Sequence, residues 1–194
     1  MILVYVEPIP DLNDLAISKS QGRVFERGKR VMGPATEAAI ASAVRLGGEQ
    51  LGLIVGTDDD TGIARRGLAL GLNRVILVAH AEAREFDGLV RARIAARMIR
   101  ETGARLVLIE SGLAEVAFRI SEATGLRVGS LSSGLEPAIL RVGESSTRPR
   151  IPSAIDIVHA AKKEIVRRSA DSLGLPADDL IPRRVVRATR LVQP

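Results

Sequence analysis

The groups that could do chemistry in this chain of 194 residues lie in short turns. The turns Gly33-Pro34-Ala35-Thr36 and Gly56-Thr57 each combine backbone N–H groups with a hydroxyl, at points where a helix is expected to begin. A helix start favours negative charge because its first N–H groups lack partners and its dipole is positive there. Either turn could therefore bind an anion such as phosphate, or could be an ordinary capped helix start. The residues leave both interpretations open.

Two further turns are acidic. Asp58, Asp59 and Asp60 follow an apolar run and could bind Mg²⁺, but consecutive residues rarely converge on one ion. We expect the last of them to cap the next helix instead. The other turn, Glu110-Ser111-Gly112, is too short to surround a phosphate with several amides, and its carboxylate would repel one. Neither acidic turn is predicted to be a metal or phosphate site.

The composition offers few residues for other kinds of active site. The chain has no cysteine and only two histidines, His80 and His159, which lie far apart in sequence. Thiol chemistry is therefore excluded, and neither a zinc site nor a Ser-His-Asp triad is expected. The motifs GxGxxG and GxSxG are absent, as is the GxxxxGK phosphate loop. Since no nucleophile, base and oxyanion donors assemble, we predict no catalytic residue.

The net charge of +5, carried mostly by arginine, could indicate a polyanionic partner. We favour solvated helix faces, such as the one bearing Arg91, Arg93, Arg97 and Arg100, because no long basic run occurs and aromatic residues are scarce. The opening 1–6 is too short for a signal peptide, and no apolar run approaches the roughly 20 residues that span a bilayer. We expect a cytoplasmic protein with no membrane partner and no nucleic-acid partner.

Short apolar runs alternate with amphipathic segments along most of the chain, and this pattern predicts strands that alternate with helices. The expected strands are 2–6, 51–55, 74–78, 106–109 and 137–142. The expected helices are one that opens at 32–37 and stops at Gly47, followed by 62–70, 86–102, 113–124 and 157–168. Residues 15–18 and 23–26 are expected to form a hairpin beside the main sheet.

This alternation predicts an α/β protein with an open, mostly parallel sheet that helices cover on both faces. A loop is expected at 130–134, and the segment 184–192 could pair at a sheet edge or on a partner. The chain has no internal repeat and no low-complexity linker. We therefore expect a single domain over 1–180 and a short C-terminal tail over 181–194.

Several segments, taken in order, match the pattern of one known family. They are the opening strand and Pro-Asp turn at 2–11, the helix start at 32–37 with 43–46, and the segments 67–74, 137–140, 149–150, 157–163 and 172–175. Together they resemble the β subunit of the electron transfer flavoproteins. The likeness covers most of the chain, and the ordered set is more specific than any single segment.

The resemblance implies an adenine-nucleotide α-hydrolase-like, Rossmann-like fold and a heterodimer with an FAD-bearing α subunit. Such a pair carries electrons between dehydrogenases and a quinone reductase or another acceptor, and the FAD would be held mainly by the partner. The family's β subunit usually holds AMP, or a second FAD in bifurcating members. Carried over by position, that nucleotide would contact Tyr5, the turn of Gly33, Pro34, Ala35 and Thr36, and Val55 with Gly56.

Three positions depart from the family pattern. The turn 110–112 stands where the family has its phosphate loop, and 154–156 replaces the family's partner-recognition Leu-Pro-Asn, so an acyl-CoA dehydrogenase partner is not supported. The chain also ends at Pro194, without the family's long carboxyl arm. These differences keep a second hypothesis open, namely an adenine-nucleotide-binding or sensing module without an electron-transfer role. That hypothesis predicts that the isolated chain binds ATP or AMP.

Overall fold

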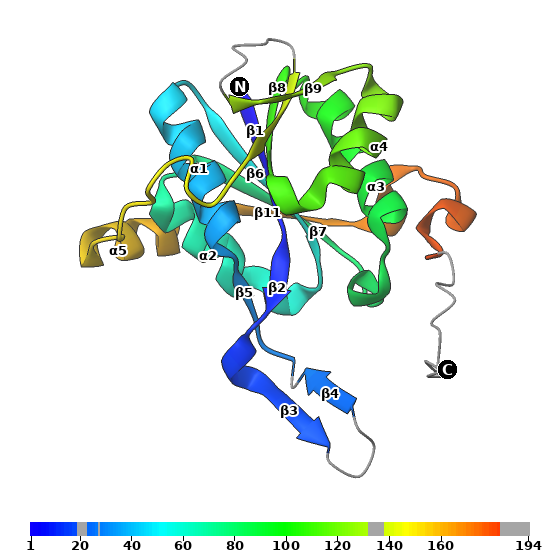
Figure 1. Cartoon of the computed structure of the whole chain (residues 1–194), viewed down its shortest axis with the longest axis horizontal. Helices are drawn as coiled ribbons and strands as arrows, with labels where there is room; N and C mark the ends of the chain where they lie inside the picture. The colour runs from blue at the N-terminus through cyan, green and yellow to red at the C-terminus, as the bar shows by residue number, and fades with distance from the viewer. Residues whose placement is uncertain (19–22, 27, 132–137, 183–194) are drawn as a thin grey trace, which may run out of the picture.

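The fold is built around a parallel sheet with helices on both faces (Figure 1). A computed structural model describes residues 1–18, 23–26, 28–131 and 138–182. Over these residues, seven strands form the main sheet in the order β11-β7-β6-β1-β8-β10-β9, and every neighbouring pair runs parallel. The predicted α/β class and the Rossmann-like arrangement are therefore confirmed.

The main-sheet strands are β1 Ile2–Val6, β6 Gln50–Gly56, β7 Arg74–Ala79, β8 Leu106–Glu110, β9 Arg127–Ser130, β10 Ala138–Val142 and β11 Ile165–Ser169. The helices are α1 Pro34–Leu46, α2 Thr61–Leu70, α3 Gly88–Thr102, α4 Ala114–Thr124 and α5 Ala154–Lys162. Two small antiparallel pairs lie outside the main sheet: β2 Pro8–Pro10 with β5 Arg30–Met32, and β3 Leu15–Ser18 with β4 Arg23–Glu26. The last pair is the predicted hairpin.

The core consists of two apolar layers, one on each face of the sheet. Because side chains alternate along a strand, Leu3 and Tyr5 of β1 pack toward α3 and α4, whereas Val4 and Val6 pack toward α1 and α2. Figure 1 shows these two helix pairs on opposite sides of the sheet. The central strand β1 is buried along its whole length, so the ends of β1, β6 and β8 are held by packing on both faces.

The predicted helix over 157–168 is wrong in its second half. Helix α5 ends at Lys162, Lys163 is already extended with φ −70° and ψ 147°, and Ile165–Ser169 forms β11 beside β7. Ile165 packs on one apolar layer and Val166 on the other, so alternation along a strand partly buries both β-branched side chains. Pairing with β7 therefore decides the structure of this segment.

The carboxyl end of α5 is tied to the body of the protein by two basic side chains. Arg65 Nη1 donates to the carbonyl of Ala160 over 2.8 Å, and Lys163 Nζ donates to the carbonyl of Leu72 over 2.9 Å. The first contact provides a partner for a carbonyl in the last turn of α5. The second ties Lys163, where the chain leaves the helix, to the segment that follows α2.

Other predicted segments agree with the structure to within a few residues, apart from the expected loop at 130–134. Ser130 ends β9, a strand that the sequence did not predict, and 132–134 lie outside the described residues. The expected pairing of 184–192 and the hairpin turn at 19–22 also lie outside them. Within the described part of the chain, no helix is long and apolar enough to cross a membrane.

Candidate functional site

The predicted ligand-binding residues gather where the strands of the parallel sheet end, which is the usual edge for a ligand in such folds. The structure divides them between the two faces. Tyr5 and Val55 belong to the apolar layer under α3, whereas the turn 33–36 begins α1 on the opposite face. Gly56 ends β6 between these two groups.

The first candidate turn is the start of α1. Gly33 is the N-cap residue and, as a glycine, has no side chain to cap the helix; Pro34 is the first helical residue. Thr36 is fully buried, and its Oγ1 donates a hydrogen bond of 2.6 Å to Glu110 Oε2 at the end of β8. A Cβ built on Gly33 would lie 3.9 Å from the same carboxylate oxygen. A carboxylate of the chain itself therefore lies at the helix start.

The second candidate turn follows β6. The carboxylate of Asp60 accepts a hydrogen bond of 2.8 Å from the backbone N–H of Thr57, and the two residues form a reciprocal capping box. A Cβ built on Gly56 would lie only 2.3 Å from Asp60 Oδ2, so this position requires glycine while Asp60 stays in place. Asp60 stands at the N-cap position of α2, but its side chain makes no cap hydrogen bond to that helix, so the prediction that it caps the next helix is wrong. Its carboxylate instead bonds back to Thr57 and fills the turn.

The acidic run does not converge on one point, because each carboxylate has its own partner. Asp58 Oδ1 lies 3.2 Å from Arg167 Nη1, and Asp59 Oδ2 lies 3.6 Å from Arg84 Nη2. Asp60 is buried and turned toward its own backbone. Among the described residues, no group of three or more acidic or histidine side chains is arranged to hold a metal ion.

Arg91 is a buried residue that the sequence did not identify. It was expected on a solvated face of its helix, but only 7% of it is exposed, so that expectation is wrong for this residue. Its Nη1 lies 3.1 Å from Glu7 Oε1 and donates to the carbonyl of Val55 over 3.3 Å. Its Nε and Nη2 donate to the carbonyls of Phe86 and Ala83 over 3.1 and 3.0 Å. Arg91 thus joins the ends of β1 and β6 to the segment before α3.

Tyr5 lies beside this ion pair and is fully buried. Among the described residues its hydroxyl has no hydrogen bond of normal geometry, although Glu7 and Arg91 are close neighbours. Burial raises the pKa of the Tyr5 hydroxyl well above its usual value, and the Glu7 carboxylate raises it further. Burial also raises the pKa of Glu7, while the Arg91 charge opposes that shift. The Tyr5 hydroxyl is therefore neutral at physiological pH, and surrounding protein covers it completely.

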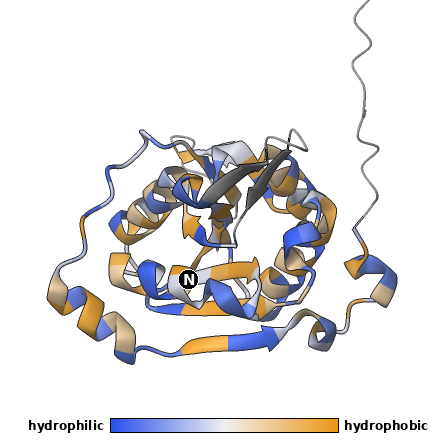
Figure 2. Ribbon diagram, turned by 90° about the horizontal axis from the view of Figure 1, so that it is seen from below, coloured by the Kyte–Doolittle hydropathy of each residue, from blue (hydrophilic) through white to orange (hydrophobic). Residues whose placement is uncertain are grey.

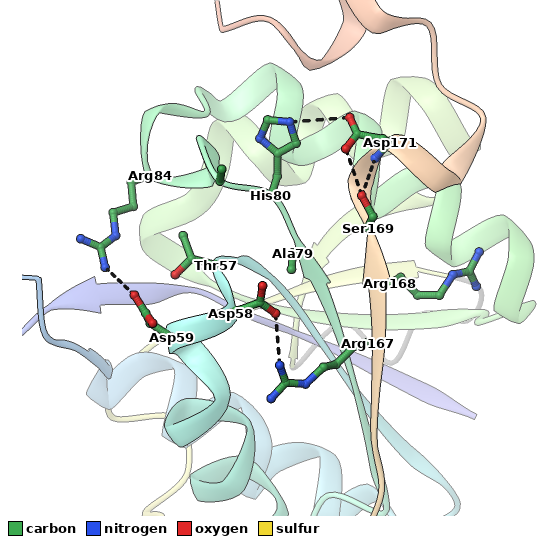
Figure 3. A pocket seen from close by; sticks show the side chains of 11 residues that line it. Thr57, Asp58, Asp59, Ala79, His80, Arg84, Arg167, Arg168, Ser169 and Asp171 are labelled. Carbon is green, nitrogen blue, oxygen red and sulfur yellow. Dashed lines mark hydrogen bonds and ion pairs between the residues drawn. The ribbon is translucent and has the colours of Figure 1, made fainter.

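A groove of about 780 Å³ opens over the ends of β6, β7 and β11 (Figure 3). Arg84 and Arg167 point toward Asp59 and Asp58 there, and His80 Nε2 faces Asp171 at 3.7 Å. The lining is polar, but Arg84 and Arg167 each face a carboxylate, so their charge is largely balanced. The groove could not be predicted from the sequence, because β11 forms one of its walls and was not predicted as a strand.

A second exposed feature is the apolar surface of α5, which we define as Ile155, Ile157 and Val158 of the helix together with Ile151 just before it. These side chains are 66%, 56%, 54% and 92% exposed, in that order, although isoleucine and valine are usually buried. Figure 2 shows α5 at the periphery of the molecule, with orange hydrophobic segments. A group of exposed apolar side chains on one short segment is typical of a surface that meets another protein.

The fold is that of a Rossmann-like α/β protein. At the edge of its sheet, the two turns that could bind a ligand are occupied by the carboxylates of Glu110 and Asp60. Residues 22–140, which are more than half of the chain, match the electron transfer flavoprotein domain. The chain belongs to the electron transfer flavoprotein family, so the resemblance predicted from sequence is confirmed at the level of the family. No curated protein matches the chain.

The family is one of flavoproteins, and its nucleotides carry phosphate groups. A phosphate does not fit the two candidate turns as they are built here, because Glu110 lies at the start of α1 and Asp60 fills the turn after β6. A phosphate at either point would meet a carboxylate at short range, where like charges repel. The side chains of Tyr5 and Val55 are also fully buried.

Proposed function

We propose that this chain is a β-type subunit of an electron transfer flavoprotein. It pairs with an FAD-bearing α-type subunit, and the pair carries electrons between dehydrogenases and an acceptor. Membership of the family supports the electron-transfer role. The ordered resemblance of its segments to the β subunit, from the first strand to 172–175, supports the subunit type.

One observation carries the proposal that the flavin belongs to the partner. At the edge of the sheet where a nucleotide would be expected, Glu110 and Asp60 occupy the two helix starts. Arg91 and Glu7 fill the space beside Tyr5 and Val55. Side chains of the chain itself thus occupy the edge of the sheet where a nucleotide would bind. This arrangement fits a flavoprotein subunit that supports a cofactor held by its partner.

The chain's residues then act as a scaffold. Arg91 holds the ends of β1 and β6 against α3, so the edge has a defined shape. The apolar surface of α5 supports docking of a second protein, because burying those side chains removes apolar area from water. Its Ile155 falls within 154–156, where the resemblance puts the family's partner-recognition segment. The different residues at 154–156 point to an electron donor other than an acyl-CoA dehydrogenase.

Co-expression with an FAD-bearing α-type subunit from the same genome tests the proposal. We expect the two chains to elute together in size-exclusion chromatography as a one-to-one complex with flavin absorbance. The matched control is the same α-type subunit expressed with an unrelated Rossmann-like protein. If the chain forms no complex with any α-type subunit of its genome, the proposal is wrong.

A further inference from the structure

The environment of Glu110 differs from that of an ordinary surface carboxylate. Glu110 is the last residue of β8, where it stands opposite Val142 of β10, and a 3-10 turn follows at once. It is half-buried, and its Oε2 accepts the 2.6 Å hydrogen bond from the buried hydroxyl of Thr36. The strand therefore directs this carboxylate at the first turn of α1.

Two glycines flank the carboxylate. A Cβ built on Gly33 would lie 3.9 Å from Oε2, and a Cβ built on Gly112 would lie 3.6 Å from Oε1. No side chain of either residue competes for this space. Negative charge at this point is stabilised by the positive end of the α1 dipole, as a bound anion would be.

We propose that Glu110 is a built-in anion that takes the place of a ligand's phosphate at the start of α1 and so excludes nucleoside phosphates from this turn. The carboxylate has the charge and the hydrogen-bond acceptors that a helix start selects in a phosphate. A phosphate that entered would have to displace a charge-assisted hydrogen bond to Thr36 and would then meet an unpaired carboxylate.

The second turn agrees with this role, whereas the charges around Glu110 are mixed. Glu7 and Glu110 repel each other, but Arg91 balances the charge of Glu7, and Arg141 Nη2 donates to the carbonyl of Ser111 beside Glu110. After β6, the carboxylate of Asp60 accepts a hydrogen bond from the backbone N–H of Thr57. Both turns that the sequence offers to an anion are thus filled by carboxylates of this chain. The inference stands on this geometry, which also supports the proposal that the flavin belongs to the partner, but it does not depend on complex formation.

Isothermal titration of AMP and of inorganic phosphate into three proteins tests the proposal. They are the wild-type chain, Glu110→Ser, and Glu122→Ser, which removes an exposed carboxylate of α4 as a matched control. We expect Glu110→Ser to bind both ligands at least tenfold more tightly than the wild type, and Glu122→Ser to match the wild type. Adding Thr36→Val to Glu110→Ser should abolish the gain, because the hydroxyl then no longer meets the phosphate.

Two results would overturn the proposal. A folded Glu110→Ser protein, judged by circular dichroism, that gains no affinity for AMP or phosphate would show that Glu110 does not block the turn. Stoichiometric AMP released from the denatured wild-type chain, identified by mass spectrometry, would overturn it without any variant. Glu110→Gln, which keeps the shape and removes the charge, replaces Glu110→Ser if the serine variant does not fold. Neither result bears on whether the chain forms a complex with an α-type subunit.

Discussion

Arg91 and Glu7, which are 84 positions apart in the chain, form a buried ion pair with 3.1 Å between Nη1 and Oε1. The same guanidinium donates to the backbone carbonyls of Val55, Phe86 and Ala83. One side chain therefore fixes three segments that meet at the edge of the sheet. The shape of that edge, and any surface it presents to a partner, depends on this contact.

Replacing Arg91 by methionine should destabilise the protein by about 3–5 kcal/mol, the usual effect of removing one partner from a buried ion pair. The loss arises because Glu7 and three backbone carbonyls remain buried without their donor. Urea unfolding followed by circular dichroism measures the change in the free energy of unfolding.

Arg97→Met is the control, because Arg97 lies on the same helix but is exposed, and its effect should stay within about 0.5 kcal/mol. The double variant Arg91→Met with Glu7→Gln should be less damaged than Arg91→Met alone, since no unpaired charge is left. Equal stability of Arg91→Met and Arg97→Met would contradict the structural role given to this pair.

Gly56→Ala should cost about 1–3 kcal/mol, the range for overpacking a well-packed site. The added methyl would lie 2.3 Å from Asp60 Oδ2 and would push that carboxylate away from the backbone N–H of Thr57. Gly62→Ala is the matched control, because nothing lies within 4 Å of a Cβ there and alanine favours a helix. Thermal unfolding of the two variants compares them. A Gly56→Ala protein as stable as Gly62→Ala would show that Asp60 does not fill the turn.

Asp156 should make the free energy of unfolding decrease as the pH falls into the acid range. The Arg150 guanidinium and the Ser153 cap hold the pKa of Asp156 well below its usual range. An unfolded aspartate has a pKa of about 3.9, so this stabilisation is fully present above that pH and is lost as the pH falls toward the folded pKa. Between about pH 6 and about pH 2.5, the urea midpoint of the wild type should fall more than that of Asp156→Asn. Parallel losses in the two proteins would contradict a stabilising role for this carboxylate.

The alternating strands and helices could be predicted because β1, β6, β7 and β8 are short apolar runs with clear boundaries. The strand β11 could not be predicted in this way. Ile165 and Val166 follow an apolar helical segment without a glycine or proline between them, so local periodicity continues the helix. Only the free edge of β7, a tertiary feature, selects the extended form.

The candidate turns were located correctly as turns, but their contents depend on distant residues. Thr36 meets Glu110 from 74 positions away, and no local pattern joins them. The burial of Arg91 likewise requires carbonyls from Val55 and Phe86 to converge on it. Its neighbours Arg93 and Arg97 have the same residue type and a similar local setting, so the sequence alone could not distinguish the buried arginine from the others.

The central claim is that this chain is a flavoprotein subunit whose flavin is held by its partner. The most direct measurement is the FAD content of the purified two-chain complex and of this chain alone, after denaturation and quantification of the released flavin. One FAD per complex, with none from this chain alone, is the predicted result. Stoichiometric FAD released from this chain purified by itself would contradict the claim.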